Sequence, residues 1–477
     1  MKKLTIKTPL LLKNIGYSTV SVLFDRLGTA LVLFVVSKLL GKAATGSYDL
    51  GMTYYSMGSI IAAWGLGALL VRETAARREK FPHYFSNYLI IRFLIRLLVS
   101  FFVILLGWTL PNYECVTRWS ITILALCIPL TATSSLFQSA FFVFEKLKLT
   151  CLISILATAF RILGTYLIIS KMINPLLKVA WFQLVVFAFI LAVYVAITCR
   201  YLSRWQAKLD RTFITEQVIE AVPFFLYAAI MTLENRVDVI LISLFMKEDS
   251  VGTYAVMTML LWVAYLVPEG LRNSVLPALA RYRSVSTDLL AQKFRLIVKY
   301  CLLITVPLAV GGFFLSKHLV NFLYKGQYLP VIRLLQITIW CHLLCFDYPV
   351  FAYIDNSKKE KTVVVLALIS LVVTVGLNLL FLPSMGLKGA AIVKLLTTYI
   401  LLLGLVLAVG REKIRLSLKK DLLFLLLAGL IMIFVIYLTA SLWIGIRLGL
   451  GLIAYILMLI RSPIFSFKEG LETFGIS

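Results

Sequence analysis

The chain has 477 residues, of which 61% are hydrophobic and only 14% are charged, whereas a soluble domain usually carries about 25% charged residues. Apolar runs of roughly 20 residues, the length that a helix needs to cross a hydrocarbon layer, recur along the whole sequence. The composition therefore predicts an all-α polytopic membrane protein and excludes a soluble globular one.

The basic residues are distributed in a regular way. Lys and Arg total 47 against 22 Asp and Glu, a formal net charge of +25, which in a soluble protein would suggest binding to nucleic acid. Here they gather in every second connection between apolar runs, for example in residues 72–80, 200–211, 281–295 and 411–420. This positive-inside pattern predicts a multi-pass protein of the cell (cytoplasmic) membrane, with both termini cytoplasmic and no nucleic-acid partner.

The sequence shows no motif for metal or cofactor chemistry. The seven cysteines lie mostly inside apolar runs and form no disulfide framework. The cluster of Cys341, His342 and Cys345 has neither the zinc spacing nor the order of a haem attachment motif. P-loop, HExxH, G-x-S-x-G and Gly-rich dinucleotide motifs do not occur, and the external connections are short. We therefore expect no cofactor, no metal site and no enzymatic activity.

Polar segments divide the sequence into about 14 transmembrane helices. We expect two six-helix lobes, within residues 1–211 and 212–412, followed by two additional helices and a cytoplasmic tail in residues 413–477. The spans are expected near residues 13–38, 48–70, 88–110, 119–144, 150–171, 176–199, 218–246, 251–276, 294–316, 328–353, 362–382, 388–410, 421–442 and 444–461.

A repeat supports the two-lobe arrangement. The segment GSYDLGMTYYS begins at Gly46 after the first span, and GTYAVMTMLLW begins at Gly252 after the seventh. Both open with Gly-x-Tyr, continue through one span, and close on a small residue followed by Arg77 or Arg281. Because six spans separate the copies, both have the same orientation, which predicts a parallel repeat about an axis along the membrane normal. Transporters built in this way enclose a cavity between two lobes.

Several motifs resemble those of one transporter family. The segments DRLGTALVLFVVSKLLG, GSYDLGM, GLGALLVRETAAR, NRVDVILISLF, VGTYAVM and LPALAR are similar to polysaccharide and oligosaccharide flippases (O-antigen transporter type) of the multidrug, oligosaccharidyl-lipid and polysaccharide exporter superfamily. The resemblance implies a protein that moves a polyprenyl-pyrophosphate-linked oligosaccharide from the cytoplasmic to the outer leaflet by alternating access. Its implied partners are membrane lipid, the lipid-linked glycan, and a glycan polymerase or glycosyltransferases.

The resemblance leaves two alternatives open. Lipid II flippases of the same superfamily are expected to carry additional arginines in the second and eighth spans, whereas residues 51–70 and 251–267 of this chain are uncharged. A lipid II flippase is therefore the less favoured reading. The other alternative is a cation-coupled multidrug or small-molecule antiporter of the same superfamily, in which acids rather than arginines would be expected in the cavity.

Among the basic residues inside predicted spans we single out four: Arg26, Arg161 and Arg236 near the middle of their spans, and Lys394 toward the outer third. A charge at the centre of a span costs about 2.5–3.5 kcal/mol even on lenient scales, so such residues usually face water or a partner. The basic residues outnumber the central acids, and a guanidinium can engage two phosphate oxygens at once. We predict that these four residues bind the pyrophosphate group. The alternatives are pairing of Asp25 with Arg26 or Arg236, and snorkelling of Lys394.

Two acids flank Arg236 in the seventh span. Glu234 and Asp238 are four residues apart and share one helical face, while Arg236 points about 160° away from each of them. Two carboxylates side by side in a poorly hydrated site cannot both be ionised cheaply. The pair therefore either keeps one carboxyl group protonated or recruits a cation. The pair is our candidate for coupling to an H⁺ or Na⁺ gradient. The alternative is a set of salt bridges to other helices.

Further charged residues lie near the predicted cytoplasmic edge, namely Glu220 and the pair of Glu269 and Arg272. Together with Asp25, we expect Glu269 and Arg272 to act in ion coupling or in gating contacts between the lobes, with ordinary interfacial solvation as the alternative. The prolines expected to bend spans and let the lobes rock are Pro129, Pro223, Pro268 and Pro307.

Overall fold

The computed structural model describes residues 8–110, 112–201, 210–265, 287–344, 360–410 and 419–461. All regular structure in these ranges is helical, which confirms the predicted fold class. The chain forms two compact units, Met1–Val256 and Met257–Ser477. The lobe boundaries expected from the repeat stay a prediction.

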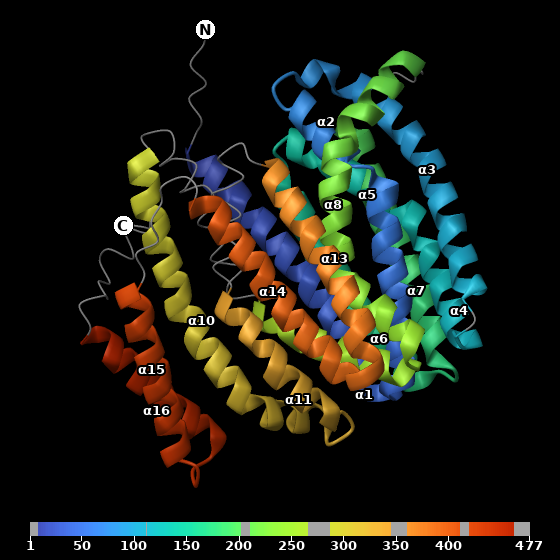
Figure 1. Cartoon of the computed structure of the whole chain (residues 1–477). Coiled ribbons are helices and arrows are strands. Elements are labelled where there is room, and N and C mark those ends of the chain that lie inside the picture. Colours follow the sequence, from blue (N-terminus) through green and yellow to red (C-terminus); the bar gives the residue numbers. More distant parts are fainter. Residues whose placement is uncertain are drawn as a thin grey trace. The chain divides into compact units, whose positions relative to one another are not determined.

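The described part of the first unit consists mostly of long helices (Figure 1). Residues 248–265 form a further helix that begins in this unit. The elements are α1 (Thr8–Ala63), α2 (Leu66–Thr74), the 3₁₀ turn η1 (Arg78–Lys80), α3 (Phe81–Thr109), α4 (Cys115–Ala125), α5 (Cys127–Val143), α6 (Leu147–Lys171), α7 (Pro175–Tyr201) and α8 (Arg211–Phe245).

The second unit is also helical where it is described. Its α13 and α14 are joined by a tight turn in which Gly386 has φ +58°, a conformation that glycine adopts without strain. The elements are α10 (Thr287–Tyr324), α11 (Leu329–Thr338), the 3₁₀ helix η2 (Ile339–Leu344), α13 (Glu360–Met385), α14 (Leu387–Gly410), α15 (Lys419–Leu438) and α16 (Ile444–Ile460).

The described helices agree with the predicted spans; parts of the spans expected near residues 251–276 and 328–353 lie outside the described residues. Among the described residues, nine helical stretches are long and apolar enough to cross a membrane, and three shorter apolar helices accompany them. The first of these stretches holds both of the first two predicted spans, because α1 continues through a kink at Gly41 (φ +83°). A second break at Gly65 (φ +66°) separates α1 from α2. The chain is thus a multi-pass membrane protein.

Two prolines are accommodated by hydroxyl groups from neighbouring helices. Pro129 has no N–H to donate to the carbonyl of Ala125, and the hydroxyl of Ser100 on α3 donates to that oxygen instead, at 2.8 Å. Pro307 similarly cannot bond to the carbonyl of Leu303 within α10. There the hydroxyl of Tyr455 on α16 donates at 3.0 Å. In hydrocarbon each freed carbonyl must be satisfied internally, so these bonds tie α3 to α4 and α16 to α10.

The surface of α3 shows how the helices meet lipid. Leu94, Leu98 and Phe101 are 61%, 70% and 68% exposed, whereas Arg92 and Arg96 on the same helix are almost fully buried. A soluble monomer does not expose such a continuous apolar face. Side chains of α3 therefore divide into a lipid-facing apolar side and a polar side turned toward α5.

Candidate functional site

The helix of residues 248–265, which follows α8, contacts α1 closely through the two glycines of the repeat. A Cβ atom on Gly46 would lie 2.0 Å from the carbonyl oxygen of Glu248, and one on Gly252 would lie 2.0 Å from the carbonyl oxygen of Lys42. Each carbonyl belongs to the residue four positions before the other glycine, so the contact is reciprocal. This reciprocity is what a parallel repeat produces when its two copies meet at their axis. We call the region around this contact between Gly46 and Gly252 the Gly46 end.

Buried polar side chains complete the Gly46 end. The carboxylate of Glu248, only 6% exposed, accepts a hydrogen bond of 3.0 Å from the Thr117 hydroxyl. The hydroxyl of Tyr113 lies 2.8 Å from that of Ser243 and 2.9 Å from that of Tyr54. The Thr117 bond joins α4 to the helix of residues 248–265, and the Tyr113 hydroxyl links the end of α8 to α1. Buried polar contacts therefore hold these helices together.

Arg236 lies on α8 and forms an ion pair with Asp49 on α1, at 3.4 Å between Nη1 and Oδ1. The side chain of Asp49 is 6% exposed, while that of Arg236 is 30% exposed. Asp49 is three residues beyond Gly46, and the two partners are 187 residues apart in the sequence. The pairing of Arg236 with Asp25, one of the alternatives considered from the sequence, is therefore not the contact observed.

The two acids beside Arg236 have separate environments. Asp238 is 2% exposed, and its Oδ2 accepts a hydrogen bond of 2.6 Å from the Tyr254 hydroxyl. Glu234 is half-buried. Their four-residue spacing places both on the side of α8 away from Arg236, so the pair can act independently of the Arg236 contact.

Asp25 and Arg26 lie on the first half of α1, against α6. Oδ2 of Asp25 accepts a hydrogen bond of 3.2 Å from the Ser154 hydroxyl, which lies 2.7 Å from the hydroxyl of Ser21. Both Asp25 and Arg26 are exposed. The helices can approach because Gly28 faces Thr158, whose Oγ1 would lie 2.9 Å from a Cβ at that position. The carboxylate thus sits among hydroxyl oxygens, a set of ligands that suits a hard cation.

Arg161 is buried on α6. Its Nε donates to Oε1 of Gln183 at 3.0 Å, and its guanidinium lies 5.6 Å from the ring centroid of Phe187. Tyr55 stacks on the other side of that ring with centroids 5.5 Å apart. Within the described part of the chain no carboxylate lies within the 4 Å of an ion pair to Arg161. The described close contacts of its guanidinium are thus a neutral amide and the face of an aromatic ring.

The remaining predicted site residues lie outside the first unit. Lys394 lies on α14 in the second unit and is half-buried. Glu269 and Arg272 lie outside the described residues. Of the predicted phosphate-binding residues, the first unit therefore contains Arg26, Arg161 and Arg236.

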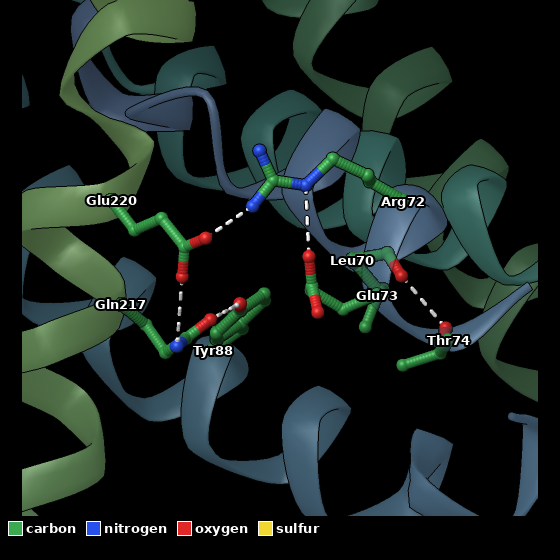
Figure 2. A network of polar contacts seen from close by, with 7 residues as sticks. All are labelled: Leu70, Arg72, Glu73, Thr74, Tyr88, Gln217 and Glu220. Atoms are coloured by element: carbon green, nitrogen blue, oxygen red, sulfur yellow. Dashed lines mark hydrogen bonds and ion pairs between the residues drawn. The ribbon is translucent and has the colours of Figure 1, made fainter.

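The opposite part of α8 contacts α2 and α3 through a polar network (Figure 2). Arg72 on α2 forms ion pairs with its neighbour Glu73, at 2.8 Å, and with Glu220 on α8. The other carboxylate oxygen of Glu220 accepts a hydrogen bond of 3.3 Å from Gln217, whose Oε1 accepts one of 2.6 Å from the Tyr88 hydroxyl. The side chains of Arg72 and Glu220 are each 45% exposed. We call this region the Arg72 end.

Aromatic packing reinforces the Arg72 end. The indole of Trp64 stacks on Phe225 with ring centroids 4.4 Å apart, and its Nε1 donates to the carbonyl of Val218 at 3.3 Å. Gly65 lies directly against α8, because a Cβ there would come within 2.8 Å of the main-chain nitrogen of Phe225. Glu220, expected from the sequence to be an edge residue, thus belongs to a packed contact between helices.

Sequence reasoning missed three charged residues of the first unit. Asp49 stands at the start of the second predicted span, where it looked like part of the polar connection before it. Arg92 and Arg96 were not singled out, although they are four residues apart among apolar neighbours, which is the signal of one helical face. Both donate to the carbonyl of Ala132, at 3.1 and 3.3 Å. They brace α3 against α5 rather than meeting an acid.

The sequence matches a family model for polysaccharide biosynthesis proteins over residues 11–283, which is more than half of the chain. No curated protein sequence gives a significant match. The family match covers the first unit from residue 11 onward, including the parts of α1, α6 and α8 that hold Arg26, Arg161 and Arg236.

Solved transporter structures share the fold. Lipid II flippase MurJ in an inward closed conformation superposes with a TM-score of 0.77 at 17% identity, covering 93% of this chain and 98% of that one. An inward-facing multidrug resistance MATE family transporter of the MOP superfamily gives 0.66 at 15% identity, with 83% and 96% coverage.

A MOP superfamily transporter from Pyrococcus furiosus, described by the reverse polarity of its binding pocket, gives a TM-score of 0.53 at 12% identity, with 85% and 95% coverage. At these identities the similarities show the fold, which is that of membrane transporters. The resemblance expected from the sequence motifs is therefore confirmed, and the chain belongs to the polysaccharide biosynthesis protein family.

Proposed function

We propose that the protein is a flippase that moves a polyprenyl-pyrophosphate-linked oligosaccharide from the cytoplasmic to the outer leaflet of the cell membrane, for assembly of a surface polysaccharide or glycan. Family membership and the transporter fold support this proposal. From the basic connections we infer that the Arg72 end faces the cytoplasm and that the Gly46 end faces the outer side. Alternating access then means opening one of these ends while the other stays closed.

The single observation that carries the proposal is Arg161. Among the described residues, the buried guanidinium of Arg161 forms no ion pair and its hydrogen-bond partner is a neutral amide; the carboxylate of Asp25 interacts with it only at longer range. A charge without a close partner is costly inside a membrane protein. An anionic ligand supplies a close counter-charge. Pyrophosphate is the charged group that all polyprenyl-linked glycans of this kind share, and the guanidinium plane can bind two of its oxygens.

Arg26, Arg236 and Lys394 are the other proposed ligands of the pyrophosphate. Arg26 is exposed and the Arg236 side chain is 30% exposed, so neither residue is fully enclosed by the described structure. For Glu234 and Asp238 we propose coupling to an H⁺ or Na⁺ gradient, and the hydroxyl-rich surroundings of Asp25 make it a further candidate for ion coupling.

Surface glycan is the measurement that tests the proposal, in cells that depend on this protein for it. Arg161→Gln, Arg26→Ala and Arg236→Ala should each abolish surface glycan while the protein remains inserted at normal levels. Arg78→Ala is the control, because Arg78 forms an exposed ion pair with Glu145 and such pairs contribute little. Normal glycan from the Arg161→Gln and Arg236→Ala variants would contradict the proposal.

Two other functions remain as alternatives. The MATE-like fold and the hydroxyl groups around Asp25 favour a cation-coupled multidrug or small-molecule antiporter as the second candidate. It predicts resistance to cationic dyes that is lost in Asp25→Asn. The fold shared with MurJ makes a lipid II flippase the third, which predicts rescue of cells depleted of their own lipid II flippase.

A further inference from the structure

The contact between Arg236 and Asp49 is weak for an ion pair. A single Nη1 to Oδ1 distance of 3.4 Å joins them, whereas charge-assisted hydrogen bonds of arginine are about 2.7–2.9 Å long and often come in parallel pairs. The Arg236 side chain is also 30% exposed. The guanidinium therefore keeps donors on its accessible side that Asp49 does not use.

Asp49 depends on this contact more than Arg236 does. Its side chain is 6% exposed, and its Oδ2 is buried without a hydrogen-bond partner in the described structure. Arg236 is the cation that forms an ion pair with it. A buried carboxylate that loses its cation is strongly destabilised, because neither water nor another charge replaces the lost interaction.

Other acids near α8 have different partners. Asp238 accepts a hydrogen bond from Tyr254, and Glu248 accepts one from Thr117. Glu234 shares the Asp238 side of the helix, about 160° from Arg236. The group that a ligand must displace to bind Arg236 is therefore the carboxylate of Asp49.

We propose that Asp49 is a positioning residue that occupies Arg236 in the empty protein and yields it to the diphosphate group of the substrate. This inference rests on the proposed function. A diphosphate offers several oxygens in the spacing that a guanidinium binds in parallel, so it competes well with one oxygen at 3.4 Å. Binding of the diphosphate then leaves Asp49 buried with no cation.

The position of Asp49 couples this event to the Gly46 end. Asp49 is three residues from Gly46, whose close contact with the Glu248 carbonyl closes that end. Opening the Gly46 end lets water reach the Asp49 carboxylate and removes the free-energy cost of keeping this charge buried without a cation. When substrate is bound, the carboxylate of Asp49 has a lower free energy with the Gly46 end open than with it closed. Substrate binding therefore shifts the protein toward the outward-open state. After the substrate leaves, Asp49 binds Arg236 again and the end closes.

Binding of inorganic pyrophosphate to the purified full-length protein, measured by calorimetry, gives the first test. Asp49→Asn should bind pyrophosphate about tenfold more tightly than the wild type, which is near the low end of couplings measured for close charge pairs. Asp49→Glu keeps the charge and should bind like the wild type. Adding Arg236→Ala to Asp49→Asn should abolish the gain. A purely structural role of Asp49 would lower thermal stability without raising this affinity.

Opening of the Gly46 end is the second measurement. Ser47 is 3% exposed, so Ser47→Cys, in a protein with the exposed Cys115 and Cys199 replaced by serine, reports opening through its reaction with a maleimide. Pyrophosphate should speed labelling when Asp49 is present. With Asp49→Asn it should bind tightly yet leave labelling unchanged, since no buried carboxylate remains to be hydrated.

The outcomes separate this inference from the proposed function. Pyrophosphate binding by the wild type with no gain in Asp49→Asn, or equal acceleration of labelling with and without Asp49, overturns the role of Asp49 alone. Absence of pyrophosphate binding in every variant overturns both the role of Asp49 and the diphosphate substrate.

Discussion

At the Gly46 end, main chain meets main chain, and the polar groups that join the helices are buried. At the Arg72 end, α8 is held by side chains, among them an ion pair whose two members are each 45% exposed. Both contacts lie within the first unit, and Glu220 and Arg236 on α8 are about 24 Å apart at 1.5 Å per residue. The helices of the first unit thus contact one another in two different ways.

The difference concerns how each end can open. Exposed side chains can separate one at a time, at a cost of about 0–1 kcal/mol for such an ion pair. A glycine packed on a carbonyl has no intermediate arrangement, because closely packed interfaces switch between discrete states. We infer that the Gly46 end opens in one step and that the Arg72 end opens gradually. Four variants test this difference, and they are ordered here by the loss of stability expected for each.

The largest effect is expected at Gly46. Gly46→Ala places a methyl group where the Glu248 carbonyl oxygen lies 2.0 Å away, so the helices must separate. We expect a loss of about 1–3 kcal/mol or more in stability, together with loss of export. The melting temperature of the purified protein measures the first quantity. Gly16→Ala, also on α1 but with nothing within 4 Å, is the matched control and should melt no lower than the wild type.

Removing the carboxylate of Glu248 should have the next largest effect. Glu248→Ala leaves the Thr117 hydroxyl and the main-chain N–H of Glu114 without their shared acceptor. Because these are buried bonds to a charged group, we expect about 2–3 kcal/mol of destabilisation. Asp249→Ala changes the adjacent exposed acid and should have no measurable effect in the same denaturant titration. Equal midpoints for the two variants would argue against a buried polar contact at this end.

Trp64→Phe tests the Arg72 end with a smaller change. The substitution keeps an aromatic ring against Phe225 but removes the bond from Nε1 to the Val218 carbonyl. The expected cost is about 1 kcal/mol. Trp181→Phe, at a position 49% exposed on α7, serves as the control for loss of an indole. A cost for Trp64→Phe as large as that of Glu248→Ala would remove the contrast between the ends.

The smallest effect on stability is expected for Arg72→Ala, within about 0–1 kcal/mol, because its contacts with Glu220 and Glu73 are exposed to solvent. Arg78→Ala breaks another exposed pair and should give a similar value. Raising the salt concentration should reduce both effects. A cost that is large and independent of salt would show that the Arg72 end is as tightly closed as the Gly46 end.

Much of the helical fold could be predicted from the sequence. Apolar runs separated by charged connections located the spans, because lipid imposes one length and one polarity on every crossing helix. The repeated Gly-x-Tyr motif also marked the contact of Gly46 with Gly252, although the reciprocal packing itself needed coordinates. Between the spans predicted to end near residue 38 and to begin near residue 48, the sequence indicated a connection, whereas the structure has one helix, α1, that continues through this segment with a kink at Gly41.

The candidate site was less predictable. The charge pattern identified Arg161 and Arg236 as unusual, since charges are rare at bilayer depth. It could not show that Arg236 contacts Asp49, because the partners are 187 residues apart and no local spacing links them. Arg92 and Arg96 illustrate the opposite case. Their spacing shows a shared face, but only the fold shows that the face meets the carbonyl of Ala132.

The bond from Tyr455 to the Leu303 carbonyl has a practical consequence for mapping topology. Because α16 supplies the donor that Pro307 lacks, a reporter fused after α14 would leave α10 with an unsatisfied carbonyl in hydrocarbon. Truncated fusions would then describe a disturbed second unit. Insertion of the reporter into connections of the intact chain avoids this error.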